Sequence, residues 1–167
     1  LAQLSNSTVI PNPIVEISNH LIACNKKPVI IAAGRIAPVK GFERLIDAWA
    51  LIEKNPPEWQ LHIYGEGDSD YVNTLQAKIS QLGLEDTVVI YPAVNDIQTK
   101  IAGASIYAMT SHTECFPMVL LEAMQCKTSI IAFDCPTGPR SIITKNTGVL
   151  VENGNVNTFA DKLTTLI

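Results

Sequence analysis

The 167-residue sequence lacks the features that define several broad classes of protein. Its apolar runs stay well short of the ~18 residues that a membrane-spanning helix needs, and no signal peptide is expected at its start. Asp and Glu (16) outnumber Lys and Arg (12), so the basic face that binds nucleic acid is not expected. Hydrophobic residues (47%) and charged residues (17%) occur in proportions that indicate one folded α/β domain.

Cysteine is scarce and scattered. Cys24, Cys115, Cys126 and Cys135 form no C-x-x-C pair and adjoin no cluster of histidines, so we expect neither a metal site nor a disulfide framework. Free thiols in a reducing cytoplasm are expected instead. Cys115 lies near a predicted helix start, where thiol pKa values fall, but no base at an informative spacing supports a nucleophilic role for it.

Two common phosphate-binding motifs are also missing. The sequence contains no G-x-x-x-x-G-K-[ST] P-loop, and Gly65-Glu66-Gly67 lacks the third glycine of the dinucleotide fingerprint. On its own this glycine pair predicts a turn. Any phosphate site must therefore be built in another way.

Apolar runs of strand length alternate with segments of helical periodicity. Strands are predicted at residues 28–34, 59–64, 87–91, 105–109, 129–133 and 148–151, and helices at 42–54, 70–82, 95–102, 117–126 and 156–167. The first run is nearly continuous in Val, Ile and Ala, which is typical of a strand covered on both faces. The alternation predicts a doubly wound, parallel, Rossmann-like α/β sheet, in which ligands bind beyond the carboxyl ends of the strands.

Two cations follow the first predicted strand. An arginine such as Arg35 can fork onto two phosphate oxygens, and Lys40 adds a point charge at the start of a helix. The free N–H groups of that helix favour the same anion. The alternative is a pair of solvated surface cations.

Two carboxylates lie on either side of the start of the helix predicted at residues 117–126. Glu114 lies in the loop ahead of this helix, and Pro117 is predicted as its first residue because a missing N–H is harmless there. Glu122 interrupts the apolar surface of the helix and needs hydrogen-bond donors, such as the hydroxyls of a ribose. Alternatively, one acid complements the helix dipole and the other lies on a solvated edge. A phosphate-binding site with a carboxylate at each end, Glu114 and Glu122, predicts a nucleotide sugar as ligand.

The spacing Gly34-Arg35-(x)4-Lys40-Gly41, followed by Glu114-(x)7-Glu122 within ECFPMVLLEAMQC, resembles the family 4 glycosyltransferases of the GT-B fold. Turns similar to those of that family occur in the same order at Pro11-Asn12-Pro13, Gly65-Glu66-Gly67 and Gly138-Pro139. The resemblance covers most of residues 8–160 and only the C-terminal, donor-binding half of such enzymes. It implies that residues 28–167 are the donor-binding domain. Residues 1–27 would then be an entry segment or hinge from an N-terminal half that carries the acceptor site.

The resemblance also implies an activity, which is a retaining, metal-independent transfer of a sugar from a nucleoside diphosphate donor without a further cofactor. A UDP-sugar is expected before a GDP-sugar, and this chain alone is expected to be inactive. Arg35 and Lys40 would hold the diphosphate and stabilise the charge on the leaving group, while Glu122 binds the ribose and Glu114 the transferred sugar. Arg35, Lys40 and Glu114 are thus the expected catalytic residues. Further donor contacts are expected from Gly34, Gly65, Phe116, Pro117, Met118 and Val119.

The proline-rich turn at residues 134–139 is similar to members that build bacterial surface polysaccharides. This similarity implies a glycan or lipid-linked acceptor and a cytoplasmic enzyme, with peripheral membrane contact through the N-terminal half. Two residues depart from the family pattern. Cys115 replaces the glycine that usually follows the first Glu, and Ser141 stands where a Glu is common.

Other interpretations remain open at this point. One is a GT-B epimerase or a phosphorylase half, the latter with a lysine-bound pyridoxal group. Another is a non-catalytic nucleotide-binding module of the same fold. A flavodoxin-like domain is disfavoured because Arg35 stands where an acidic cluster is expected. His112 as a base lacks any group in the sequence that orients it, and Glu114 as a nucleophile is conceivable but not favoured.

Overall fold

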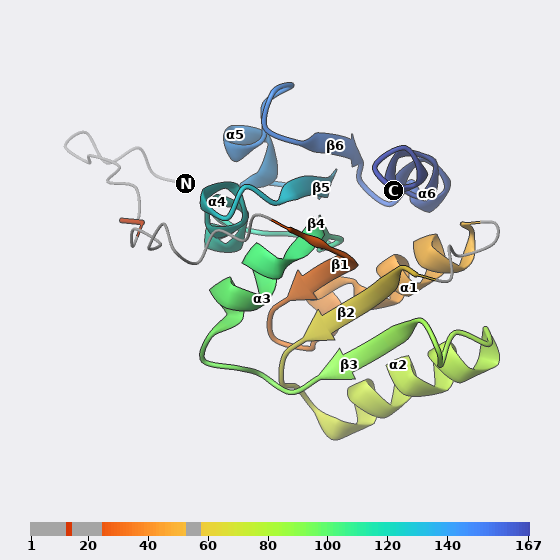
Figure 1. Cartoon of the computed structure of the whole chain (residues 1–167). Coiled ribbons are helices and arrows are strands. Elements are labelled where there is room, and N and C mark those ends of the chain that lie inside the picture. The colour runs from red at the N-terminus through yellow and green to blue at the C-terminus, as the bar shows by residue number, and fades with distance from the viewer. Residues whose placement is uncertain (1–12, 15–24, 53–57) are drawn as a thin grey trace, which may run out of the picture.

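The computed structural model describes residues 13–14, 25–52 and 58–167. Of the predicted entry motif Pro11-Asn12-Pro13 only Pro13 lies within these residues, and Cys24 lies outside them. In the described part of the chain, strands and helices alternate from Lys27 to Thr164 (Figure 1).

All the strands lie in one parallel sheet, in the order β3-β2-β1-β4-β5-β6. They are β1 (Lys27–Ala33), β2 (Gln60–Tyr64), β3 (Val88–Tyr91), β4 (Ala104–Met109), β5 (Ser129–Asp134) and β6 (Val149–Glu152). The order reverses between β1 and β4, because the chain crosses back over the sheet there. Such a switch point leaves a crevice at the carboxyl edge. The predicted doubly wound parallel sheet is confirmed.

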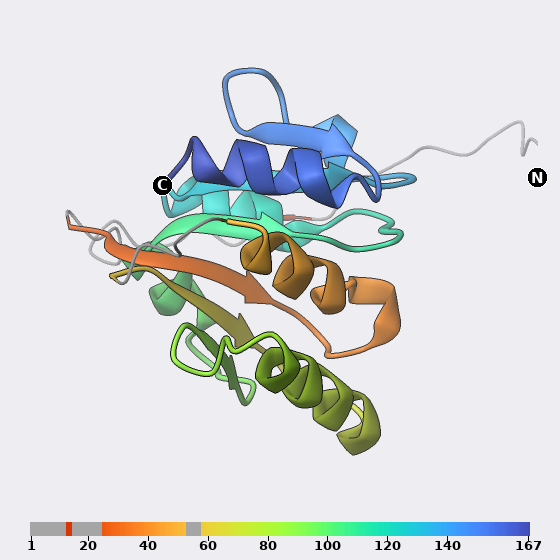
Figure 2. The same cartoon turned by 90° about the vertical axis from the view of Figure 1, so that its right-hand side faces the viewer.

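Helices cover both faces of this sheet. One face carries α1 (Phe42–Ala50), α2 (Ser69–Gln81) and α6 (Val156–Thr164), onto which Figure 2 looks directly. The other carries α3 (Ile97–Gly103), α4 (Met118–Gln125) and α5 (Pro139–Ile142). A 3-10 turn, η2 (Pro38–Lys40), lies in the loop that leads from β1 to α1.

The hydrophobic core consists of two clusters, one for each face. In β1 the side chains of Ile30 and Ala32 belong to the cluster under α1, α2 and α6, and Ile31 belongs to the cluster under α3 and α4. Phe133 of β5 meets Phe159 of α6 with ring centroids 4.7 Å apart. Because successive residues of a strand point to opposite faces and both faces are covered, the strands must be apolar almost throughout.

Several predicted boundaries differ from those in the structure, and three of these differences have an identifiable local cause. The helix expected to begin at Pro117 begins at Met118, because Pro117 is extended (φ −75°, ψ 90°) and its carbonyl accepts the N–H of Leu120, as an N-cap residue does. The first helix ends at Ala50 and not at Lys54. The N–H of Ile52 donates to the carbonyl of Trp49, three residues earlier, and this 3-10 type of hydrogen bond ends the α-helix.

The third boundary concerns the apolar turn expected at Ile142 and Ile143. This stretch is the end of α5, which starts at Pro139, a residue whose fixed φ suits a first helical position.

None of the helices in the described part of the chain is long and apolar enough to cross a membrane. No group of three or more His, Cys, Asp or Glu side chains within the ranges that the structure describes could hold a metal ion.

Candidate functional site

The loops after β1 and β4 lie against each other at the switch point. The hydroxyl of Thr110 donates to the carbonyl of Gly41 at 2.8 Å, and the N–H of His112 donates to the carbonyl of Val39 at 2.8 Å. Gly41 has φ +63°, and a Cβ there would lie 2.2 Å from the oxygen of Thr110. The close approach of the two loops therefore depends on a glycine.

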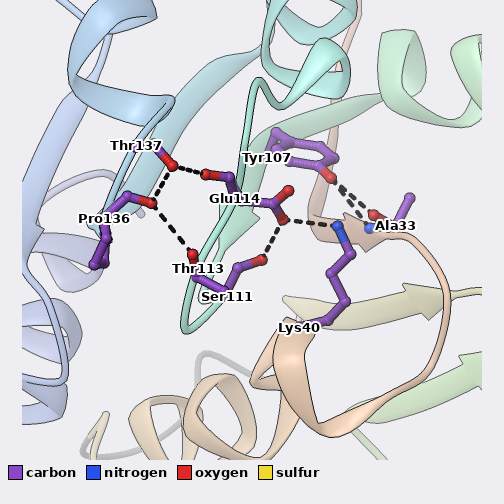
Figure 3. A network of polar contacts seen from close by, with 8 residues as sticks. All are labelled: Ala33, Lys40, Tyr107, Ser111, Thr113, Glu114, Pro136 and Thr137. Carbon is purple, nitrogen blue, oxygen red and sulfur yellow. Dashed lines mark hydrogen bonds and ion pairs between the residues drawn. The ribbon is translucent and has the colours of Figure 1, made fainter. Parts of the chain in front are cut away.

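Lys40 and Glu114 meet between these loops. The Lys40 Nζ donates to Glu114 Oε1 at 2.7 Å, and the Ser111 hydroxyl donates to the same oxygen at 2.7 Å (Figure 3). The two charged side chains are only 29% and 12% exposed. Charge-assisted bonds in such partly dry surroundings are among the stronger ones in proteins, so the position of the Glu114 carboxylate is fixed.

The backbone of Glu114 is fastened to the loop that follows β5. The hydroxyl of Thr137 donates to the carbonyl of Glu114 (Figure 3). The N–H of Glu114 donates to the carbonyl of Pro136 at 3.4 Å. Gly138 has φ +99°, and a Cβ on it would lie 2.6 Å from Cδ of Pro117. The turn at Gly138 is thus shaped to sit against the start of α4.

A cavity of about 770 Å³ opens beside this pair, across the carboxyl ends of β1, β2 and β3. Among the predicted donor contacts, Gly34, Arg35, Gly65 and Val119 line it. Its floor also includes Ala33, which it shares, like Val119, with a small adjoining pocket lined by Lys40 and Glu114. The structure therefore brings Arg35 to one pocket and Lys40 and Glu114 to a second pocket that shares two lining residues with it.

The apolar end of this cavity was not predicted from the sequence. Tyr64, Ala93, Val94 and Ile97 line it beyond β2 and β3. Their position could have predicted a ligand contact, because these residues follow the carboxyl ends of two predicted strands, at the edge where such folds bind ligands.

The remaining predicted residues lie on α4 and just before it. Phe116, Met118, Val119 and Glu122 are half-buried, and Pro117 is buried. Phe116 and Val119 pack against the cluster under α3 and α4. Within the described ranges the Glu122 carboxylate forms neither a hydrogen bond nor an ion pair, so it is available to a ligand.

Tyr107 lies beneath both predicted acids. Burial raises the pKa of its phenol strongly, and the negative charges of Glu114 and Glu122 add to that rise, against a hydrogen bond with the Ala33 backbone that lowers it. Both carboxylates therefore lie close enough to this one buried group to affect its ionisation.

His112 has an orienting partner that the sequence did not reveal. Its Nε2 lies 3.1 Å from Glu43 Oε1 on α1, and the other oxygen of Glu43 accepts from the Tyr71 hydroxyl of α2 at 2.6 Å. Burial opposes ionisation of Glu43, but the bonds from Tyr71 and His112 outweigh it, so the pKa of Glu43 lies below its usual value. The loop that carries Glu114 is thereby tied to two helices.

A family model for the glycosyl transferases group 1 matches residues 16–167. The chain belongs to this family. Among its curated relatives, the amylovoran biosynthesis glycosyltransferase AmsD of Erwinia amylovora is 35% identical over 146 residues, which are 87% of this chain and 40% of that protein.

Two solved structures of glycosyltransferase chains resemble this fold closely. A Staphylococcus aureus TarM variant, in complex with fondaparinux, α-GlcNAc-glycerol and UDP, superposes with a TM-score of 0.83 at 29% identity, over 92% of this chain and 31% of TarM. Anabaena HepE in complex with UDP-glucose gives a TM-score of 0.76 at 31% identity, over 86% of this chain and 39% of HepE. The chain spans less than half the length of the curated relatives it matches.

Proposed function

We propose that this chain is the donor-binding domain of a retaining, metal-independent glycosyltransferase that uses a UDP-sugar. The observation that carries the proposal is the 770 Å³ cavity at the switch point, with Arg35 in its wall and the Lys40–Glu114 pair beside it. The presence of UDP in the TarM complex and of UDP-glucose in the HepE complex supports this choice of donor.

In this proposal the donor lies across the carboxyl edge of the sheet. Its diphosphate binds between Gly34, Arg35 and the start of α4, where Lys40 adds a second positive charge. Glu122, whose carboxylate is free to accept hydrogen bonds, takes the ribose hydroxyls. The transferred sugar then reaches Glu114.

The chemistry required of the protein is mainly electrostatic. When the bond between the sugar and the diphosphate breaks, negative charge grows on the departing diphosphate, and Arg35 and Lys40 are placed to stabilise it. These two cations take the part that a metal ion plays in other transferases, which is why we propose a metal-independent reaction that needs no cofactor.

Glu114 acts in this proposal by holding sugar hydroxyls and not as a nucleophile. Lys40 and Ser111 already donate to one of its oxygens, which lowers the reactivity of the carboxylate and leaves its second oxygen to accept from a hydroxyl. This arrangement supports transfer without a covalent intermediate on Glu114.

The complete enzyme would add an N-terminal half that binds a glycan or lipid-linked acceptor. Residues 28–167 would form the donor domain and residues 1–27 the entry to it. The similarity to AmsD supports a role in bacterial surface polysaccharide synthesis. We further propose that the complete enzyme acts in the cytoplasm, at the inner face of the membrane.

Calorimetric titration with UDP tests the proposal. The unmodified chain should bind UDP, and Arg35→Ala and Glu122→Ala should each weaken binding on the order of tenfold, the effect of losing a charge-assisted contact. Arg140→Ala and Glu85→Ala are matched controls, since Arg140 pairs with Asp134 and Glu85 with Ser80, and neither lines the cavity. Absence of UDP binding by the unmodified chain, or equal binding by all four variants, would refute the proposal.

A further inference from the structure

Tyr107 of β4 is a buried group to which the proposed reaction assigns no role. Its side chain is 1% exposed, below the floor of the site. Its hydroxyl donates to the carbonyl of Ala33 at 3.1 Å and accepts the N–H of Ala33 at 3.3 Å (Figure 3). One phenol thus satisfies both backbone groups of the last residue of β1.

These contacts occur where the sheet opens. The pairing of β1 with β4 ends at Ile31 and Tyr107, so Ala33 lies beyond the last pair on that side. On the other side Ala33 still pairs with Tyr64 of β2. The hydroxyl of Tyr107 therefore takes the place of the neighbouring strand at the point where β1 and β4 separate. Without it, two backbone groups next to the crevice would lack a protein partner on that side.

Ala33 is directly joined to the proposed phosphate site. The next residue, Gly34, donates its N–H to the carbonyl of Tyr64 at 3.0 Å. A Cβ on Gly34 would lie 3.6 Å from Cε of Lys40, which shows how closely the lysine stem follows this backbone. A rotation of the Ala33 peptide would thus move the Gly34 backbone, the Arg35 side chain and the packing of Lys40 together.

We propose that the Tyr107 hydroxyl is a positioning group for the diphosphate loop. It fixes the end of β1, so that Gly34, Arg35 and Lys40 are in place before the donor arrives. It contacts no reacting atom, and its effect is confined to the part of the donor that this loop holds. The inference rests on the proposed function, because it assigns the loop to a diphosphate. Preorganisation of this kind raises affinity by removing the cost of ordering the loop on binding.

Tyr107→Phe removes the hydroxyl and keeps the ring. Calorimetric titrations with UDP and with uridine separate the two parts of the ligand, because only UDP carries the diphosphate. We expect Tyr107→Phe to weaken UDP binding on the order of tenfold, the usual effect of losing a pair of hydrogen bonds, and to leave uridine binding unchanged.

A second buried hydroxyl supplies the control. Thr128 donates to the carbonyl of Ile101 at 2.8 Å and accepts from Lys26, at the opposite edge of the sheet. Thr128→Val should lower the melting temperature and leave the ratio of UDP to uridine affinity unchanged. A shifted ratio in Tyr107→Phe alone supports the proposal.

Other results would overturn it. Equal weakening of UDP and uridine by Tyr107→Phe indicates a merely structural role, and unchanged UDP affinity indicates no role. No UDP binding by the unmodified chain would instead refute the proposed function, and this inference with it. If Tyr107→Phe does not fold, amide hydrogen exchange of the unmodified chain decides. The N–H of Ala33 should exchange as slowly as that of Ile31, and fast exchange overturns the proposal.

Discussion

Lys40 and Glu114 lie 74 positions apart in the sequence, yet their charged groups are 2.7 Å apart in the folded chain. One follows β1 and the other follows β4, the two strands between which the sheet order reverses. The switch point thus places a cation expected at a diphosphate beside an acid expected at a sugar. In the structure the two charges neutralise each other. A ligand that binds there must therefore contact both side chains while they remain paired.

The energy of this pair can be measured by a double-mutant cycle. Lys40→Met and Glu114→Gln should each lower the free energy of unfolding, and the double variant should lose less than the sum of the two. We expect a coupling of about 1 kcal/mol, because both side chains are largely shielded from water. Urea denaturation of the four proteins at pH 7 gives this value. Additive losses would show that the contact contributes no net stability.

Two glycines with the same backbone conformation isolate the contact between the site loops. Gly41 (φ +63°) and Gly83 (φ +66°) are both left-handed, but a Cβ on Gly83 meets no atom within 4 Å, whereas one on Gly41 meets the Thr110 oxygen at 2.2 Å. Gly83→Ala should cost about 1 kcal/mol in free energy of unfolding, from backbone strain alone. Gly41→Ala should cost at least about 2 kcal/mol more because the loops must separate. Similar losses in both variants would contradict this.

Residue patterns predicted the sheet and the loops of the site well, for a physical reason. Strands covered on both faces are continuous apolar runs, and a parallel sheet gathers its carboxyl ends at one edge, so Arg35, Lys40 and Glu114 were assigned to neighbouring loops from spacing alone. The direct Lys40–Glu114 contact was not predicted. Nor were the partners of Tyr107 and His112, because they depend on strand register and on side-chain direction across elements far apart in the sequence.

Lys26 is a further example of a role that spacing could not reveal. It falls in the predicted entry segment, yet its Nζ donates to the carbonyls of Ala102, Ala104 and Cys126 and to the Thr128 hydroxyl, at 2.9 to 3.1 Å. Burial lowers the pKa of this ammonium, and the nearby Cys126 opposes that shift. The four acceptor oxygens offset the cost of burying the charge. Three of them are carbonyls at the C-terminal ends of helices, those of Ala102 and Ala104 at the end of α3 and that of Cys126 at the end of α4, where a cation is favourable.

Lys26→Met should therefore lower the free energy of unfolding by about 2–3 kcal/mol, since several carbonyls lose their donor at once. Lys27→Met is the control, because the exposed neighbour forms no side-chain hydrogen bond within the described ranges. Urea denaturation at pH 7 measures both. A loss in Lys26→Met no larger than in Lys27→Met would show that the carbonyls are satisfied as well by water.

Glu43 should make the stability of the chain depend on pH in the acid range. The bonds from Tyr71 and His112 place its folded-state pKa below the usual 4.5, so it releases its proton more readily when folded. The resulting stabilisation is complete above the usual pKa and is lost as the pH falls through the lowered pKa.

Tyr71→Phe removes one of the bonds to Glu43 and should cost about 1 kcal/mol in free energy of unfolding at pH 7. The difference from the unmodified chain should shrink as the pH falls through the lowered pKa, because the carboxyl of the folded chain is then protonated. Tyr91→Phe is the control, since its hydroxyl forms no hydrogen bond in the described part of the chain. Urea denaturation at a series of pH values from 7 downward measures this difference, and a difference for Tyr71→Phe that stays constant throughout the acid range would exclude the charge of Glu43 as its source.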